Sequence, residues 1–257
     1  MSQLMLHDLL FTLALSLVVQ AVFFAFAATL KTDKVTDLSY GLTFVLIAGA
    51  LLLHADLGDL AQVGLALMVS LWGLRLAGYL VYRIWHMGRD ARFDGIREKF
   101  WSFFKFWLFQ GIAVWVIMLP VTLWYSRPGP WTLWMCAGSS IWALGLVIEA
   151  VADQQKFAFK RTPAGRTRWT DTGLWRYSRH PNYFGEILCW LGVFLFTAPD
   201  LGAWIALGIV GPLAITGILL FATGIPTLEA SAQKKWGSDP EYQAYRARTR
   251  TLLPWPR

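Results

Sequence analysis

The chain alternates between long apolar runs and shorter polar connections. Seven runs are long enough to cross a bilayer as a helix, which takes about 20 mostly apolar residues. They cover residues 9–30, 38–54, 61–82, 103–125, 131–151, 182–198 and 201–222. This pattern predicts an all-α, polytopic integral membrane protein with seven transmembrane helices. The composition agrees, because 56% of the 257 residues are hydrophobic and 15% are charged, which is more apolar than a soluble domain usually is.

The basic residues sort to alternate connections, and this predicts the orientation of the chain. Of the 23 Lys and Arg residues, all but Arg75 and Arg127 lie in or beside the first, third and fifth connections or after the last run. Because such residues collect in cytoplasmic loops, we expect the N-terminus outside and the C-terminus in the cytoplasm, across the inner membrane if the cell is bacterial. The net charge of +7 therefore fits membrane orientation, and no nucleic-acid partner is expected.

No cleavable signal peptide is expected, because the first apolar run follows no basic residue and is long enough to span. The two cysteines, Cys136 and Cys189, lie in apolar runs, and the four histidines lack zinc-ligand spacing. We therefore expect neither a disulfide framework nor a metal site.

The polar segments are organised around one long loop and a C-terminal tail. No repeat or low-complexity tract is present, so residues 1–257 are expected to form a single domain. The loop, at 152–180, is of a length that is more often functional than idle. In the tail, Asp239 and Pro240 predict the N-cap and first residue of a helix that holds Tyr242, Tyr245 and Arg246 within one turn. An amphipathic helix on anionic lipid headgroups is an alternative interpretation of this tail.

Polar and charged residues inside apolar runs are site candidates, because charges in a bilayer are costly and usually face a protein interior or a wet cavity. The third run carries Arg75 and Tyr79 on one helix face, with Tyr82 and Arg83 one turn on. Together with the acids described next, this stripe predicts a pocket for an anionic ligand at the cytoplasmic side.

Two further pairs have the same spacing of four residues. Glu149 and Asp153 end the fifth run, and Asn182 and Glu186 begin the sixth. A buried ion pair between Arg75 and one of the glutamates is the alternative to a pocket.

The long loop offers groups that suit a nucleotide. Arginines in KRTPAGRTR match phosphates, because the planar guanidinium presents paired donors. Aromatic residues in and after the loop have faces on which flat rings stack; they are Trp169, Trp175, Tyr177, Tyr183 and Trp190. Because the chain has neither a GxGxxG motif after a strand nor a P-loop, the site would be built from helix ends and loops.

Two segments carry a family resemblance. GLWRYSRHPNYFGE and the tail LEASAQKKWGSDPEYQAYRARTRTLLPW resemble the C-terminal half of the steroid 5-alpha-reductase family, and especially its bacterial relatives of unassigned function. The RHPNY signature is shared with isoprenylcysteine carboxyl methyltransferases, phospholipid methyltransferases and sterol reductases. The resemblance implies that 131–257 is the cofactor-binding half and that the first four helices form a more variable half.

In the reductase branch, the resemblance implies that NADPH lies in a cytoplasm-facing cavity among the helices. Asn182 and Glu186 match residues that hold its nicotinamide end, and Asp153, Arg161 and Arg168 match residues that grip the adenine-ribose and phosphates. The full candidate set for the cofactor is Arg75, Tyr79, Arg83, Asp153, Arg161, Arg168, His180, Asn182, Tyr183, Glu186, Trp190, Tyr245 and Arg246.

The resemblance also implies a reaction, in which a conjugated carbon–carbon double bond of a lipophilic substrate is reduced. Steroid reductases hold the substrate ketone with a Glu on the second helix and a Tyr on the third, but Trp72 occupies the latter position here. The nearest substitutes are Asp37 and Tyr40, which we take as the candidate catalytic pair, since a phenol oriented by a carboxyl group can polarise a carbonyl. The alternative for these two is an N-cap and an interfacial aromatic residue.

Two other functions stay open at the level of sequence. The first is an S-adenosylmethionine-dependent methyltransferase acting on a lipid or a prenylated thiol, in which the region of His180, Asn182 and Tyr183 would cradle the cofactor. The second is a non-catalytic transporter or scaffold. The substrate class expected for the reductase is a 3-oxo-steroid, sterol-like, isoprenoid or enoyl lipid, and the sequence does not choose between a monomer and a homodimer.

Overall fold

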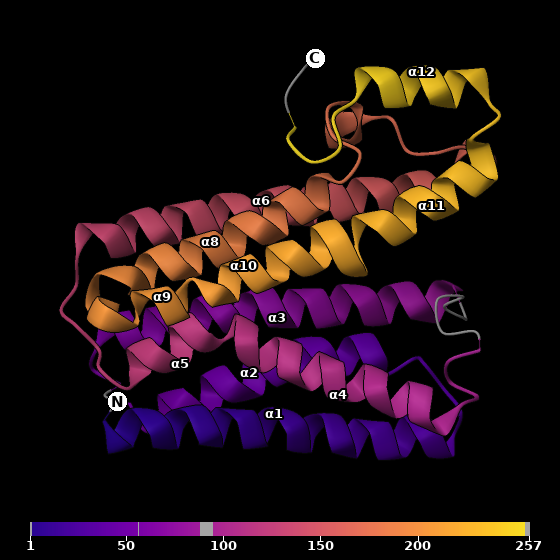
Figure 1. Ribbon diagram of the computed structural model, residues 1–257. Coiled ribbons are helices and arrows are strands. Elements are labelled where there is room, and N and C mark those ends of the chain that lie inside the picture. Colours follow the sequence, from indigo (N-terminus) through magenta and orange to yellow (C-terminus); the bar gives the residue numbers. More distant parts are fainter. Residues whose placement is uncertain (1, 56, 88–94, 255–257) are drawn as a thin grey trace. The chain divides into compact units, whose positions relative to one another are not determined.

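The computed structural model describes residues 2–55, 57–87 and 95–254, and the side chains of these residues except 83–87. Every named element in these ranges is a helix (Figure 1). The N-terminal elements are α1 (Gln3–Thr29), α2 (Thr36–Leu53), α3 (Leu60–Met87), α4 (Phe100–Ile117) and α5 (Leu119–Tyr125). They are followed by α6 (Leu133–Lys160), α7 (Pro163–Thr167), η2 (Gly173–Arg176), α8 (Pro181–Leu201), η3 (Gly202–Trp204), α9 (Ile205–Gly208), α10 (Val210–Gly217), the π-helical η4 (Ile218–Ala222), α11 (Ile225–Trp236) and α12 (Pro240–Arg248).

Seven stretches within the described residues are long and apolar enough to cross a membrane, which confirms the predicted fold class. They are Gln3–Thr29, Thr36–Leu53, Leu60–Tyr82, Phe100–Ile117, Leu133–Lys160, Pro181–Gly208 and Val210–Trp236. Large apolar side chains also point outward, with Val22 64%, Leu71 51% and Leu133 86% exposed. Such apolar surfaces are compatible with lipid. A helix suits the same environment because its backbone groups are hydrogen-bonded within the helix.

Several boundaries differ from the sequence prediction, and the first span already begins at Gln3. The fourth run, 103–125, is two helices, because Pro120 has no N–H to donate and α4 gives way to α5 at Met118. The first part of the predicted loop 152–180 is helical, since α6 continues to Lys160. The helix of the sixth run, α8, continues through Pro199. The seventh run changes from α to π at Ile218 before α11.

The tail and the start of α2 also refine the prediction. Asp239 caps α12 as expected, and its carboxylate accepts from the backbone N–H groups of Glu241 and Tyr242, with Pro240 as the first helical residue. The alternative role of Asp37 as an N-cap is wrong, because α2 starts after Val35 and Asp37 lies in its first turn.

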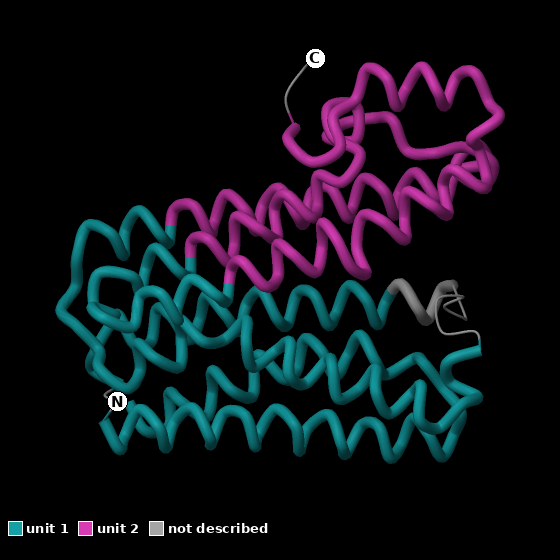
Figure 2. The backbone as a smooth tube through the Cα atoms, viewed as in Figure 1, with its two compact units in different colours: residues 1–139, 193–211 teal, residues 140–192, 212–257 magenta. Residues whose placement is uncertain are grey.

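The described residues fall into two compact units, coloured separately in Figure 2. Unit 1 comprises residues 1–139 and 193–211, and unit 2 comprises 140–192 and 212–257. Within unit 1, α2 packs on α3 so closely that a Cβ on Gly41 would lie 2.7 Å from the carbonyl oxygen of Gly73. Helix α1 packs on both α4 and α2.

Unit 1 contains a buried polar network that joins α1, α2 and α4. The amide of Gln110 donates to the side-chain oxygen of Gln20 at 2.8 Å, to Ser39 Oγ at 3.0 Å and to the carbonyl of Thr36 at 3.2 Å. The amide of Gln20 in turn donates to Thr43 Oγ1 at 2.8 Å. All five side chains are at most 8% exposed. Hydrogen bonds of this kind join helices where water is absent.

Candidate functional site

Helices α6 and α8, which carry the buried acids of unit 2, pack closely against each other. A Cβ on Gly185 would lie 2.6 Å from the carbonyl oxygen of Gly145 and 2.6 Å from the backbone nitrogen of Glu149, so the two helices touch backbone to backbone. Three acids of these helices are buried: Glu149 is 2% exposed, Asp153 6% and Glu186 8%. Three of the acids that the sequence singled out are thus buried side chains of α6 and α8.

Asn182 and Glu186 lie one turn apart in the first part of α8, which begins at Pro181. Glu186 is buried, whereas Asn182 and Tyr183 are half-buried. Within the described part of the chain, the carboxamide of Asn182 makes no hydrogen bond, so both its donor and its acceptor are available to a ligand.

Four residues just before α8, on α11 and on α12 form an ionic cluster, which we call the Glu229 cluster: Arg179, His180, Glu229 and Arg246. One carboxylate oxygen of Glu229 lies 2.9 Å from Nε2 of His180 and 3.0 Å from Nε of Arg179. The other lies 3.4 Å from Arg246. The cluster joins positions about 50 and 65 residues apart in sequence, so its assembly depends on the tertiary fold.

Two nitrogen atoms of the Glu229 cluster are buried and have no hydrogen-bond partner among the described residues. They are Nδ1 of His180, whose side chain is 6% exposed, and Nε of Arg246. The ring of His180 stacks on that of Tyr183 at 5.7 Å between centroids. Burial lowers the pKa of His180, although the hydrogen bond that its ring donates to Glu229 acts in the opposite direction. The imidazole is therefore neutral at pH 7.

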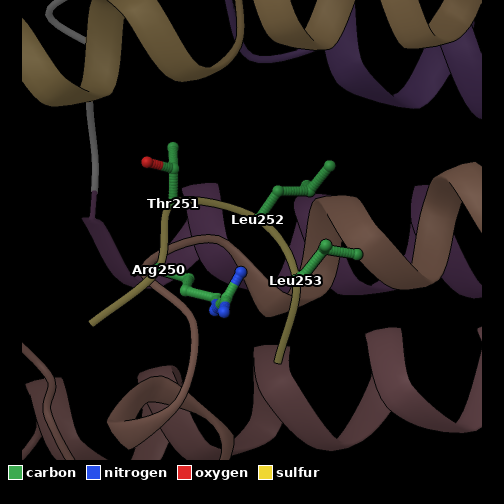
Figure 3. Close-up of a pocket in the computed structure, with 4 residues that line it drawn as sticks. All are labelled: Arg250, Thr251, Leu252 and Leu253. Atoms are coloured by element: carbon green, nitrogen blue, oxygen red, sulfur yellow. The ribbon is translucent and has the colours of Figure 1, made fainter. Parts of the chain in front are cut away.

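Hydrogen bonds join the C-terminal segment to the loop that precedes α8. Arg179 donates to the carbonyl of Thr249 at 2.7 Å and to Thr251 Oγ1 at 2.9 Å. Ser178 pairs with Arg250 in an isolated parallel bridge and donates to the carbonyl of Leu252 at 2.8 Å. A pocket of about 380 Å³ is lined by the same segment, Arg250, Thr251, Leu252 and Leu253, whose side chains are drawn in Figure 3.

Aromatic residues of the loop and tail form a core for this part of unit 2. Trp169 packs against Tyr242 and Tyr245, with ring centroids 5.0 and 6.1 Å away. The phenol of Tyr245 donates to the carbonyl of Trp175 at 2.7 Å, and burial raises its pKa. Trp169, Trp175 and Trp190 are at most 6% exposed, so the protein itself covers the faces of these three indoles.

The two arginines assigned to cofactor phosphates lie at the surface of unit 2. Arg168 is 49% exposed and pairs with Glu241 at 2.9 Å. Arg161 is exposed and covers the ring of Phe157 at 5.6 Å from its centroid. An exposed ion pair contributes about 0–1 kcal/mol, so Arg168 can exchange Glu241 for a ligand phosphate at little cost.

The remaining candidates belong to unit 1. Arg75 and Tyr79 are half-buried on α3, and Asp37 and Tyr40 are half-buried on α2. The ring of Tyr40 meets that of Phe44 edge to face at 5.1 Å, and Phe44 meets Trp72 in the same way at 5.0 Å.

The side chain of Arg83 lies outside the described residues, so its assignment stays a prediction. Among the described side chains, no group of three or more His, Cys, Asp or Glu residues could hold a metal ion.

Sequence reasoning missed Glu229 as a site residue and gave Arg179 no specific partner. The tail carries three acids among its Lys and Arg residues, Glu229, Asp239 and Glu241, and no feature of the sequence distinguishes Glu229 from the other two. The buried glutamines Gln20 and Gln110 were also missed, although each is an amide within an apolar run.

Seven apolar spans and helical polar caps define an integral membrane protein of the all-α class. The chain belongs to the DUF1295 family, described as proteins of unknown function, whose sequence model matches residues 23–249. It is also similar to an uncharacterized protein of Schizosaccharomyces pombe (strain 972 / ATCC 24843), with 24% identity over 221 residues. That match covers 74% of this chain and 62% of the relative, so the chain spans less than two thirds of the relative's length. No solved structure matches the chain.

Proposed function

We propose that the protein binds NADPH through unit 2 and reduces a conjugated carbon–carbon double bond in a lipophilic substrate, as the steroid 5-alpha-reductase family does. The observation that carries the proposal is the arrangement at the start of α8. There the unbonded carboxamide of Asn182 and the buried carboxylate of Glu186 lie one turn apart, next to the Glu229 cluster. Donors and acceptors in this number suit a ligand with amide, hydroxyl and phosphate groups.

The residues present fit the dinucleotide by their chemistry. A carboxamide binds through both its N–H and C=O groups, which Glu186 and Asn182 complement as acceptor and donor. Guanidinium groups bind phosphates with paired donors, which Arg161, Arg168 and Arg246 provide. The orphaned nitrogens of His180 and Arg246 are the further sign of a polar ligand, because buried polar atoms are rarely left without partners.

NADPH, when bound, supplies the hydride that adds to the β-carbon of the conjugated system. The proposed role of Tyr40 is to donate a hydrogen bond to the substrate carbonyl while enolate charge develops, with Asp37 orienting the phenol. Apolar side chains exposed along the helices suit entry of a steroid, sterol-like, isoprenoid or enoyl substrate from the bilayer. We further propose that the N-terminus lies outside and the C-terminus in the cytoplasm, where NADPH is available.

Ligand-dependent thermal unfolding of the purified protein tests the proposal. NADPH is expected to raise the unfolding temperature, since a ligand that binds only the folded state stabilises it by mass action. Asn182→Ala and Glu186→Gln should remove that shift, whereas Gln154→Ala, an exposed residue of α6, should keep it.

A shift with S-adenosylmethionine and none with NADPH would replace the reductase by the methyltransferase. No shift with either ligand at millimolar concentration would leave the transporter or scaffold.

A further inference from the structure

The orphaned nitrogen of His180 is the feature that extends the proposed function. We propose that Nδ1 of His180 accepts a hydrogen bond from a neutral O–H or N–H group of the bound ligand, and that Glu229 is the positioning residue that keeps this nitrogen an acceptor. The inference rests on the proposed function, in which that ligand is NADPH. It assigns a role to Glu229 and Arg179, which the sequence did not single out.

The tautomer of His180 follows from the chemistry of its partner. Oε1 of Glu229 lies 2.9 Å from Nε2. The same carboxylate accepts from Nε of Arg179 at 3.0 Å and lies 3.4 Å from Arg246, so it is ionised and can only accept. The proton of the neutral ring therefore lies on Nε2, and Nδ1 carries a lone pair.

The position of Nδ1 argues for a ligand donor. This atom is buried and has no partner within the described residues, and the ring is held in place by stacking on Tyr183. A buried acceptor without a partner destabilises the folded state, and native structures retain few of them. A donor on the ligand removes this penalty only in the complex. Binding therefore becomes more favourable by the same amount of free energy.

The surrounding charges keep the ring neutral. The charged groups that act on it are Glu229 from α11, Lys156 from α6 and Arg179 beside it in sequence. The two cations and burial together outweigh the carboxylate and lower the pKa of His180. At pH 7 the ring thus offers a lone pair, which repels phosphate oxygens and carboxylates and selects hydroxyl or amide donors.

Two sources on the dinucleotide have this chemistry, namely the nicotinamide carboxamide and a ribose hydroxyl. The adjoining guanidinium of Arg246 has a buried Nε donor without a partner among the described residues, so an acceptor atom near the ligand donor fits as well. Both sources contain a donor next to an acceptor, and half-ligands separate them.

Two substitutions at His180 separate the role of Nε2 as a donor from the role of Nδ1 as an acceptor. His180→Gln places an amide nitrogen where Nε2 was, so it keeps a donor for Glu229 and removes the acceptor at Nδ1. His180→Asn places a carbonyl oxygen near the position of Nδ1, so it keeps the acceptor and loses the bond to Glu229. We expect the NADPH dissociation constant to rise about 10-fold in His180→Gln and less than about 3-fold in His180→Asn.

The dependence on pH supplies a readout that a purely structural role would not move. In the wild type, affinity should fall as pH decreases through the pKa of His180, because protonation turns Nδ1 into a donor, and both His180 variants should lose this dependence. In Glu229→Gln the fall should move to lower pH, since the carboxylate that favours the imidazolium is gone. A titration midpoint unchanged in Glu229→Gln would overturn the role of Glu229.

The tautomer is measured without any ligand. In protein labelled with ¹⁵N-histidine, the resonances missing from His180→Gln identify His180, and Nδ1 should have the chemical shift of an unprotonated nitrogen at pH 7.5. A protonated Nδ1 would overturn the proposal. This measurement does not depend on NADPH binding, so it separates this inference from the proposed function.

Binding of half-ligands then identifies the donor. If His180→Gln weakens reduced nicotinamide mononucleotide and not adenosine 2′,5′-bisphosphate, the donor belongs to the nicotinamide half, and the reverse result assigns it to the adenosine half. NADPH affinity in His180→Gln equal to that of the wild type would overturn the inference while leaving the proposed function intact. A wild type that binds no NADPH would overturn the proposed function.

Discussion

Gly145 of α6 and Gly185 of α8 face each other with no room for a side chain on either. A Cβ on Gly145 would lie 2.6 Å from the carbonyl oxygen of Gly185 and 2.7 Å from the backbone nitrogen of Cys189. Backbone atoms cannot swing aside as the end of a flexible side chain can. The contact therefore fixes the distance between the helix that carries Glu149 and Asp153 and the helix that carries Asn182 and Glu186.

Gly185→Ala is expected to separate α6 from α8. Because overpacking a well-fitted contact costs about 1–3 kcal/mol, the unfolding temperature should drop by several degrees, and NADPH affinity should fall with it. Gly217→Ala in α10 is the matched control, since a Cβ there meets no other atom within 4 Å. Equal unfolding temperatures for the two variants, measured by differential scanning fluorimetry, would show that the α6–α8 contact tolerates a methyl group.

A second prediction concerns the buried amides of unit 1. Gln110→Leu removes three hydrogen bonds and leaves the side-chain oxygen of Gln20 without its donor at 2.8 Å. Interhelical hydrogen bonds in membranes contribute about 0.6 kcal/mol on average and at most about 2 kcal/mol, so we expect a loss in that range. A double-mutant cycle with Gln20→Leu should show coupling, whereas additive effects would mean that the two amides act independently.

The attachment of α12 to η2 leads to a third prediction. Tyr245→Phe removes the donor to the carbonyl of Trp175, and the buried carbonyl is left with one bond fewer. We expect a loss of about 1 kcal/mol, or about 2–4 °C in unfolding temperature. Tyr242→Phe is the control on the same helix, since its ring is buried in the same aromatic cluster but its hydroxyl forms no hydrogen bond with the described residues. Equal losses in both variants would indicate that ring packing alone holds α12.

The extent of sequence prediction differs between the spans and the site. The seven spans were predictable because continuous apolar runs have few other solutions in a membrane protein. The break at Met118 was not, because Pro120 stands within an otherwise apolar run, and the extension of α6 to Lys160 was not, because residues that end an apolar run can continue its helix.

For the candidate site, the placement of Asn182 and Glu186 one turn apart on one helix was predictable because their spacing is local. The Glu229 cluster was not, because Arg179 and Glu229 meet only once the tail has folded onto the loop. The aromatic residues show the same limit. Their ring faces suggested ligand stacking, yet Trp169 and Trp175 are buried against the chain itself, and composition does not distinguish a core indole from an exposed one.

The last prediction is that stability decreases on the acid side because of His180. Burial lowers the pKa of this side chain in the folded protein, so the unfolded chain binds a proton at a higher pH than the folded chain does. The stability that comes from the neutral ring is fully present above the ordinary pKa of histidine, about 6.5. It is lost as pH falls from there through the lowered pKa of the folded state. The unfolding temperature should therefore decline as pH falls below about 6.5, and the decline should be smaller in His180→Gln, which has no ring to protonate. An identical decline in the variant would assign the acid sensitivity to other groups, because His180 would then bind its proton equally well in both states.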